Sequence, residues 1–250
     1  MAGKKKRGGV RRMAGNIIMI CLAGIVVVSG WRVYKILRDY KTTNDIYKRI
    51  AELAQPQGWN GDVDFDALRE VNPDIAAWLY YESTNINYPV VKGEDNDYYL
   101  QVGFDNTWAL GGTLFIDCIT ERPFEQFNTI IYGHHMKDGS MFGDIKKLKD
   151  PEYAKEHPQL DLITPDAKHH LRICAFLNQP SDSIVYNTNY DDEDTEGKQK
   201  YIDDVRATAD YLTDEPMTVD DRLVILSTCA YEYQNARYVV VCRMIPWKES

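Results

Sequence analysis

The chain has 250 residues, of which 44% are hydrophobic and 27% charged, a composition that suits one substantial buried core and excludes a disordered or fibrous protein. The formal net charge is −9, and because residues 1–40 carry nine Lys and Arg against one Asp, residues 41–250 carry −17. Such an acidic body lacks the basic face that phosphate binding requires, which argues against a nucleic-acid partner.

The N-terminal residues combine a basic start with an apolar run, which is typical of a membrane segment. Six Lys and Arg precede the apolar stretch at 17–28. A cleaved signal peptide would need a small-x-small exit, which Val28-Ser29-Gly30 matches poorly. An uncleaved anchor fits better, because residues 31–37 prolong the amphipathic stretch and place basic side chains where they can reach the interface.

This pattern predicts four segments along the chain. Residues 1–15 form a basic cytoplasmic tail, 16–37 an uncleaved membrane anchor, 38–62 a helical stalk and 63–250 an extracellular folded domain. The orientation follows from the basic residues before the span, which stay on the cytoplasmic side.

The predicted elements begin with helices and continue mainly as strands. Ile46, Ile50 and Leu53 repeat at helical spacing over 39–54, and Asp64 or Asp66 caps a short second helix that ends near Asn72. Strands are predicted at 76–81, 86–91, 112–118, 127–132, 159–163, 169–177, 222–228 and 236–245. Short helices are predicted at 95–101, 141–148 and 151–156, and a longer one over 194–212, with Ile202, Val205, Ala209 and Leu212 on one face.

Eight such strands without regular alternation of strand and helix predict a mainly β fold, a closed or nearly closed antiparallel-type barrel decorated by helices. The acidic run at 191–194 is interpreted as a solvated loop and helix start, where carboxylates interact favourably with the helix dipole. A calcium site is the alternative, but the run lacks the ligand spacing and the glycine of an EF-hand loop.

The five cysteines differ in their surroundings. Cys21 lies in the apolar N-terminal run, and none of the others has the spacing of a CxxC pair or of a metal site. Cys118, Cys174 and Cys242 lie inside apolar strand-like runs, which predicts buried and unreactive thiols. Cys229 ends a predicted strand and is followed by polar residues, so we expect it to be accessible.

Three residues at strand ends could together carry out acyl transfer. Cys229 ends strand 222–228, His134 follows Gly133 at the end of strand 127–132, and Arg237 lies near the start of the last strand, on a segment expected to return beside Cys229. A thiolate needs a nearby cation, a histidine can protonate a departing amine, and an arginine fork can stabilise an oxyanion. Taken singly, each residue is more often structural than catalytic.

A metal site built from the five histidines is the competing chemical hypothesis. His134 and His135 are adjacent, as are His169 and His170. Neighbouring residues of a strand point to opposite faces, so neither pair forms a natural two-ligand face. The sequence therefore favours the cysteine-based site.

Several motifs of this chain resemble those of the sortase family. Leu226-Ser-Thr-Cys229 is similar to the TLxTC motif, and Ile130-Ile-Tyr-Gly-His134-His-Met is similar to the segment that carries the catalytic histidine. The resemblance extends over most of residues 65–246, and the N-terminal helices and the long helix before the last two strands resemble class B. Ile225 stands where the family usually has Thr, and Ala230 where some members have an acidic residue; neither change removes a reacting group.

The resemblance implies an eight-stranded sortase-type β-barrel with N-terminal helices, and a cysteine transpeptidase whose catalytic domain is residues 63–250. It implies that a secreted protein's C-terminal sorting signal is cleaved after Thr, held as a thioacyl group on Cys229 and passed to an amine of a peptidoglycan precursor. It also implies that His134, rather than His135, is catalytic together with Arg237, and that no metal or other cofactor takes part. The positions matching the substrate groove are Asn96, Leu100, Tyr186 and Ser227.

Two other functions stay open at the level of sequence. A surface cysteine peptidase could use the same three residues and give the acyl group to water. A non-catalytic surface-binding module could retain the barrel without the chemistry.

Overall fold

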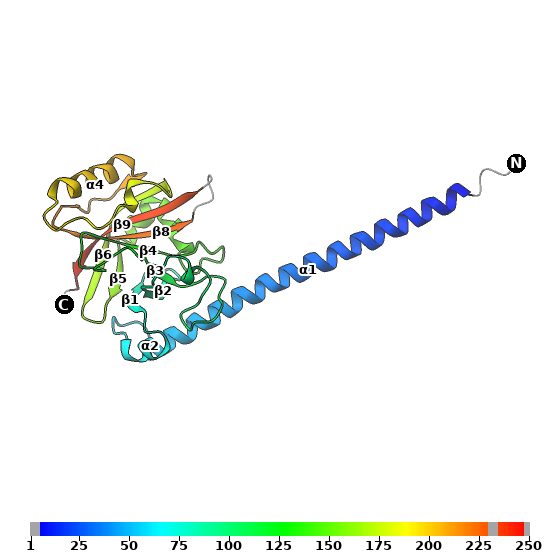
Figure 1. Cartoon of the computed structure of the whole chain (residues 1–250), viewed down its shortest axis with the longest axis horizontal. Helices are drawn as coiled ribbons and strands as arrows, with labels where there is room; N and C mark the ends of the chain where they lie inside the picture. The colour runs from blue at the N-terminus through cyan, green and yellow to red at the C-terminus, as the bar shows by residue number, and fades with distance from the viewer. Residues whose placement is uncertain (1–5, 230–234, 248–250) are drawn as a thin grey trace. The chain divides into compact units, whose positions relative to one another are not determined.

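The computed structural model describes residues 6–229 and 235–247, with side chains at 13–228 and 235–247. The chain divides into two units, Met1–Thr42 and Thr43–Ser250, and helix α1 belongs to both. The elements, labelled in Figure 1 where there is room, are α1 (Lys6–Ala54), α2 (Phe65–Val71), β1 (Ile75–Tyr80), β2 (Asn87–Val91), η1 (Tyr98–Leu100), β3 (Leu114–Ile116), β4 (Asn128–Tyr132), η2 (Gly143–Lys149), α3 (Pro151–Glu156), β5 (Gln159–Ile163), β6 (Lys168–Pro180), η3 (Ile184–Tyr186), α4 (Thr195–Thr208), β7 (Tyr211–Leu212), β8 (Arg222–Cys229) and β9 (Ala236–Pro246).

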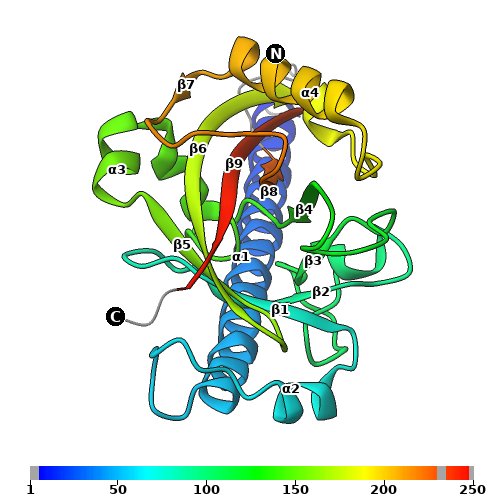
Figure 2. The same cartoon turned by 90° about the vertical axis from the view of Figure 1, so that its left-hand side faces the viewer.

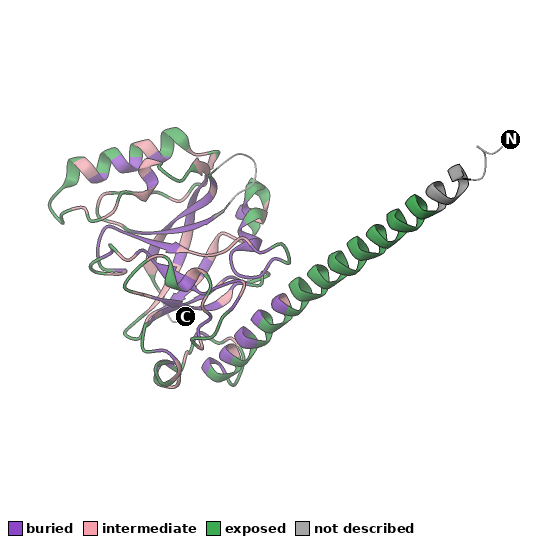
Figure 3. Cartoon of the chain, turned by 45° about the vertical axis from the view of Figure 1, so that its right-hand side comes forward, coloured by how far each residue is buried: buried purple, intermediate pink, exposed green. Residues whose placement is uncertain are grey.

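The first unit carries the apolar half of α1. Its large apolar side chains, among them Ile20, Val26 and Trp31, are exposed to solvent (Figure 3). Within the described part of the chain, α1 is the one helix whose length and apolar composition would allow it to cross a membrane. The predicted anchor segment is therefore helical and has the composition that an anchor requires.

The second unit begins with the last turns of α1, which are amphipathic as predicted. Ile46, Tyr47, Ile50 and Ala54 are buried, together with Thr43. Leu53, predicted on the same face, is 39% exposed. The buried stripe is centred on Thr43, Ile50 and Ala54, so Leu53 lies at its edge. Helix α2 follows, and the carboxylate of its N-cap Asp64 accepts a hydrogen bond from Ala67 N at 2.9 Å.

The second unit is built around a barrel of eight strands. In the order β5, β1, β2, β3, β4, β8, β9, β6, each strand is hydrogen-bonded to the next, and β5 also pairs with β6, which closes the ring. Figure 2 shows the long, curved β6 and β9 lying side by side. The predicted eight-stranded barrel with helical decoration is thus confirmed.

The pairing is mixed rather than purely antiparallel. Strands β2 and β3 are parallel, and so are β4 and β8. Parallel neighbours need a long crossover, and the one between β4 and β8 contains three other strands and α4. The prediction of an antiparallel-type barrel was therefore wrong for these two pairs.

Helix α4 is shorter than predicted and ends at Thr208. Tyr201, Ile202 and Val205 are buried in one apolar cluster with residues of β6, β8 and β9, so α4 covers part of the barrel wall (Figures 2 and 3). Leu212, predicted on the same helical face, lies instead in β7, pairs with Ala175 of β6 and is 47% exposed. A strand of two residues is too short to show an alternating pattern, which is why the sequence suggested a continued helix.

Candidate active site

The ends of β4, β8 and β9 lie at one edge of the barrel. Strands β4 and β8 are parallel, with Tyr132 opposite Ser227, so both end at the same level. Gly133 N donates a hydrogen bond to Ser227 O at 3.1 Å and prolongs this pairing. Strand β9 returns antiparallel to β8 and places Arg237 opposite Cys229. The end of β4, the end of β8 and the start of β9 therefore meet at one edge of the barrel. They carry the three residues predicted to act in acyl transfer.

A pocket of about 290 Å³ opens at this edge. Six of the seven predicted site residues line it: Asn96, Leu100, His134, Tyr186, Ser227 and Arg237. Phe115, Tyr132, Gly133, Ser181 and Thr228 complete the lining and were not predicted. The seventh predicted residue, Cys229, is the last residue of β8, and its side chain lies outside the described residues.

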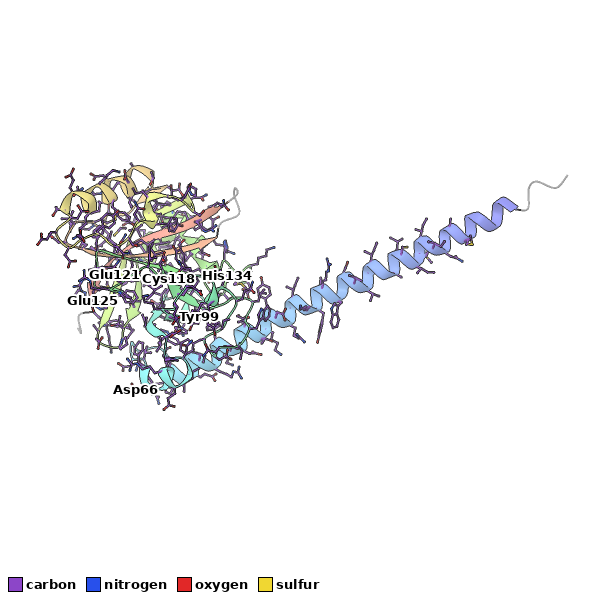
Figure 4. All side chains as sticks on the ribbon, viewed as in Figure 1. Asp66, Tyr99, Cys118, Glu121, Glu125 and His134 are labelled. Carbon is purple, nitrogen blue, oxygen red and sulfur yellow. The ribbon has the colours of Figure 1, made fainter. Side chains whose placement is uncertain are left out.

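Gly133 allows His134 to enter the pocket directly after β4. A side chain at Gly133 would approach Leu114 to 2.4 Å and Phe142 to 2.7 Å, so only glycine fits between them. His134 Nε2 lies 2.7 Å from Leu100 O (Figure 4 labels His134). Because a carbonyl oxygen can only accept, Nε2 carries the proton in this arrangement.

His135 lies in a different environment from His134. Its ring packs against Tyr238, with centroids 5.6 Å apart, and its main chain forms a bridge to Met141. His134 lines the pocket, whereas His135 is absent from the described lining residues. The geometry is thus consistent with the preference for His134 that the motif implied.

Arg237 is partly buried at the start of β9. Its Nη1 donates to the neighbouring Ala236 O at 3.0 Å, which holds the guanidinium close to its own strand. Arg237 also acts on the wall of the pocket, because its positive charge opposes the rise in the pKa of Tyr132. Burial nevertheless raises that pKa, and the carboxylate of Asp117 raises it further, so Tyr132 stays a neutral phenol.

Asp117 organises one wall of the pocket and was not singled out from the sequence. It is 6% exposed and accepts hydrogen bonds from Tyr132 Oη at 2.9 Å and from Asn96 Nδ2 at 3.0 Å. Asn96 Oδ1 in turn accepts from Cys118 N at 2.8 Å, so both ends of this amide are held. In the sequence, Asp117 is an acidic residue at the end of an apolar strand-like run. Such a residue is usually interpreted as a solvated carboxylate, so the sequence did not indicate its role.

Tyr186 and Ser227 line the pocket together. Their hydroxyl oxygens lie 2.9 Å apart in a hydrogen bond, although the residues are 41 positions apart in sequence. The ring of Tyr186 stacks on that of Tyr132 at a centroid distance of 6.3 Å. The hydrogen bond places Tyr186, one of the predicted groove residues, beside Ser227 near the end of β8.

Cys118, Cys174 and Cys242 were predicted to be buried thiols, and the prediction fails for one of them. Cys174 and Cys242 are buried as predicted, and burial raises the pKa of Cys174 to about 12 and that of Cys242 well above its ordinary value. Cys118, labelled in Figure 4, is partly exposed, so the prediction of a buried thiol was wrong there. The reason is that β3 ends at Ile116 and the chain turns away before Cys118.

Comparison with known proteins identifies relatives of the whole chain. The family described as the Sortase domain matches residues 79–245. Sortase B of Listeria monocytogenes is 28% identical over 244 residues, covering 94% of this chain and 98% of the relative. Sortase B of Staphylococcus aureus is 27% identical over 237 residues, covering 92% and 96%.

Solved structures give the same result for the fold. Bacillus anthracis sortase B, in complex with AAEK1, superposes with a TM-score of 0.74 at 28% identity and covers 84% of this chain and 100% of that one. A Staphylococcus aureus sortase B–substrate complex superposes with a TM-score of 0.75 at 25% identity and covers the same shares. The chain belongs to the sortase family of cysteine transpeptidases, and its relatives place it with the class B sortases.

Proposed function

We propose that this sortase cleaves the C-terminal cell-wall sorting signal of a secreted protein after Thr and joins the new end to an amine of a peptidoglycan precursor. The observation that carries the proposal is the pocket at the ends of β4, β8 and β9, where His134 and Arg237 lie beside the strand that ends on Cys229. A solved relative, the sortase B of Staphylococcus aureus in complex with its substrate, supports a substrate site in this fold.

The proposed chemistry proceeds in two transfers through Cys229. The thiolate attacks the carbonyl carbon of the Thr, the peptide C–N bond breaks, and His134 gives its proton to the departing amine. The acceptor amine then attacks the thioester carbonyl, His134 takes up the proton of that amine, and the thiolate leaves. Arg237 holds the carbonyl oxygen while it carries negative charge in each transfer.

The remaining lining residues are proposed to hold the signal peptide. Leu100 offers apolar surface, while Asn96 and Ser227 offer hydrogen-bonding groups to an extended backbone. Tyr186 contributes both an aromatic face and a hydroxyl group beside Ser227. Because the orientations of Asn96 and Tyr186 are fixed by hydrogen bonds, these groups would meet the peptide with little loss of conformational entropy.

We further propose that α1 anchors the enzyme in the cell membrane, with residues 1–15 cytoplasmic, 16–37 in the bilayer, 38–62 as a stalk and the catalytic domain, 63–250, extracellular. The apolar composition of the helix and the basic residues before it support this topology. The substrate and the acceptor would then both be found on the outer side of the membrane.

Alanine variants of the detergent-solubilised full chain test the mechanism with a peptide library read by mass spectrometry. Cys229→Ala should abolish both cleavage and the thioacyl adduct. His134→Ala should lower turnover by about 10²–10⁴-fold, the usual contribution of general acid catalysis. His135→Ala, the matched control, should have a mild effect because its ring packs against Tyr238 and is not among the described lining residues.

The same assay separates transpeptidation from hydrolysis and from simple binding. Faster product formation with an added amine supports transfer, whereas a rate that is independent of the amine supports a cysteine peptidase. Cleavage by Cys229→Ala would refute the proposed nucleophile, and a larger loss from His135→Ala than from His134→Ala would refute the proposed acid and base.

A further inference from the structure

The last turns of α1, residues 43–54, contact the two segments that hold His134: the one between η1 and β3, and the one that follows His134 itself. We propose that Tyr47 is a positioning residue for this histidine. Tyr47 is 4% exposed and is not among the described residues that line the pocket. The inference rests on the proposed role of His134 in acyl transfer. It extends that role to the helix that precedes the barrel.

The first connection runs through the hydroxyl group of Tyr47. This hydroxyl donates a hydrogen bond to Gly112 O and lies 2.9 Å from Thr113 Oγ1. Thr113 Oγ1 donates to Val102 O at 2.8 Å, and Thr113 N donates to Tyr99 O at 2.9 Å. The buried hydroxyl group of Tyr47 thus holds the segment that enters β3, and Thr113 connects that segment to the residues around η1.

The main chain of Gly112 lies close to the peptide group that His134 contacts, with no space for a side chain between them. Its φ is +56°, and a side chain there would lie 2.2 Å from Tyr99 O and 2.7 Å from Leu100 O. Leu100 O is the atom that lies 2.7 Å from His134 Nε2 (Figure 4 labels Tyr99 and His134). Because there is no room for a side chain between them, we infer that a shift of Gly112 toward this peptide group would move Leu100 O.

The second connection runs through the ring of Tyr47 to the main chain of His134. The ring packs edge-on against Tyr88, with centroids 5.1 Å apart. Tyr88 Oη accepts a hydrogen bond from Met141 N at 3.2 Å, and the next residue, Phe142, donates from its N to His134 O at 2.9 Å. Tyr47 therefore supports both the ring and the backbone of His134.

The chemical consequence concerns which nitrogen of His134 can exchange protons. With Nε2–H donated to Leu100 O, the neutral imidazole keeps Nδ1 unprotonated, so Nδ1 is the nitrogen that can take a proton from the thiol and give it to the departing amine. The same carbonyl also stabilises the imidazolium. If Leu100 O shifts, the ring loses both its orientation and its preference for one tautomer.

The test is Tyr47→Phe in the full chain, which removes the hydroxyl but keeps the ring against Tyr88. Histidine-selective ¹⁵N labelling reports the tautomer, and the His134 signal is assigned by its loss in His134→Ala. We expect the Nε2–H preference of His134 to weaken and kcat to fall by about tenfold, with KM for the peptide little changed. This size is taken by analogy from the hydrogen-bond partners that orient metal-binding histidines, whose loss typically costs about 10–100-fold. Gly112→Ala, whose methyl group would clash with Tyr99 O and Leu100 O, should give the same two changes.

Tyr81→Phe is the matched control. Tyr81 is 1% exposed and donates its hydroxyl to a backbone carbonyl, His157 O, at 2.8 Å, but it is not among the described lining residues. It should lower stability as Tyr47→Phe does, without altering the ¹⁵N spectrum of His134 or kcat. An unchanged His134 spectrum in Tyr47→Phe, or a changed spectrum with wild-type kcat, would overturn the inference. Activity in His134→Ala would instead overturn the proposed function, and the spectrum would still test the link from Tyr47 to His134.

Discussion

Arg237 shows how much can depend on the shape of a single charged group. Its Nη1 is engaged with Ala236 O, and a guanidinium has further N–H donors in a fixed plane that can hold a carbonyl oxygen. A lysine at the same place would supply the charge on a flexible stem with no such plane. Two roles can therefore be separated by experiment: a general cation that favours the thiolate of Cys229, and a fork that holds the developing oxyanion.

We predict that Arg237→Lys lowers kcat by about 10²–10³-fold, the typical cost of losing one oxyanion donor. The rate at which a small alkylating reagent modifies Cys229 should change far less, because the positive charge is kept. Steady-state kinetics and peptide mapping after timed alkylation measure the two effects on the same preparation. A kcat close to that of the wild type would leave Arg237 as a general electrostatic partner.

At the scale of elements, α4 is a support for the pocket as well as a cover for the barrel. Tyr201 donates its hydroxyl to Val185 O at 3.1 Å, which fixes η3 beneath the helix. Tyr186 is the last residue of η3 and bonds to Ser227 at the pocket. The N-terminus of α4 is itself held by Asp194, whose carboxylate accepts from Gly197 N at 2.9 Å.

We predict that Asp194→Ala lowers the free energy of unfolding by about 1 kcal/mol, the usual contribution of an N-cap. Urea denaturation of the full chain in detergent measures this loss. Glu193→Ala is the control, because it removes the same charge one residue earlier and leaves the cap in place. Equal losses in the two variants would show that charge near the helix end, rather than the cap hydrogen bond, stabilises α4.

At the scale of the whole molecule, charge and apolar surface are segregated along the chain. Nine Lys and Arg and the long apolar run lie in residues 1–40, and residues 41–250 carry −17. A membrane would cover the exposed apolar side chains, and the acidic domain would be repelled by an anionic surface. This division is consistent with the proposed anchoring through α1.

We predict that the full chain stays with the membrane fraction after carbonate extraction and that Val26→Arg releases a large part of it. A charge at the centre of a spanning helix costs about 2.5–3.5 kcal/mol of insertion free energy. Thr42→Arg, outside the apolar run, should stay membrane-bound. Equal retention of the two variants would contradict anchoring by this segment.

The sequence by itself determined the approximate positions of the eight barrel strands, though not of β7, and the choice of candidate residues. Strands such as β5, predicted and observed at 159–163, alternate or repeat apolar residues locally, and the motifs around His134 and Cys229 are continuous in sequence. These features depend on neighbouring residues only, so they can be recognised without the fold. The roles of His134, Cys229 and Arg237 and the four segment boundaries stay predictions.

Only the tertiary structure decided the parallel pairing of β4 with β8, the closure of β5 on β6, the role of Asp117 and the path from Tyr47 to His134. Each depends on which residues become neighbours after long crossovers, as when Tyr47 reaches Gly112 across 65 positions. Local sequence carries no record of such contacts, because they arise from closing the barrel and packing the last turns of α1, residues 43–54, against it. The sequence therefore predicted several residues that line the pocket, but it could not predict how they are arranged.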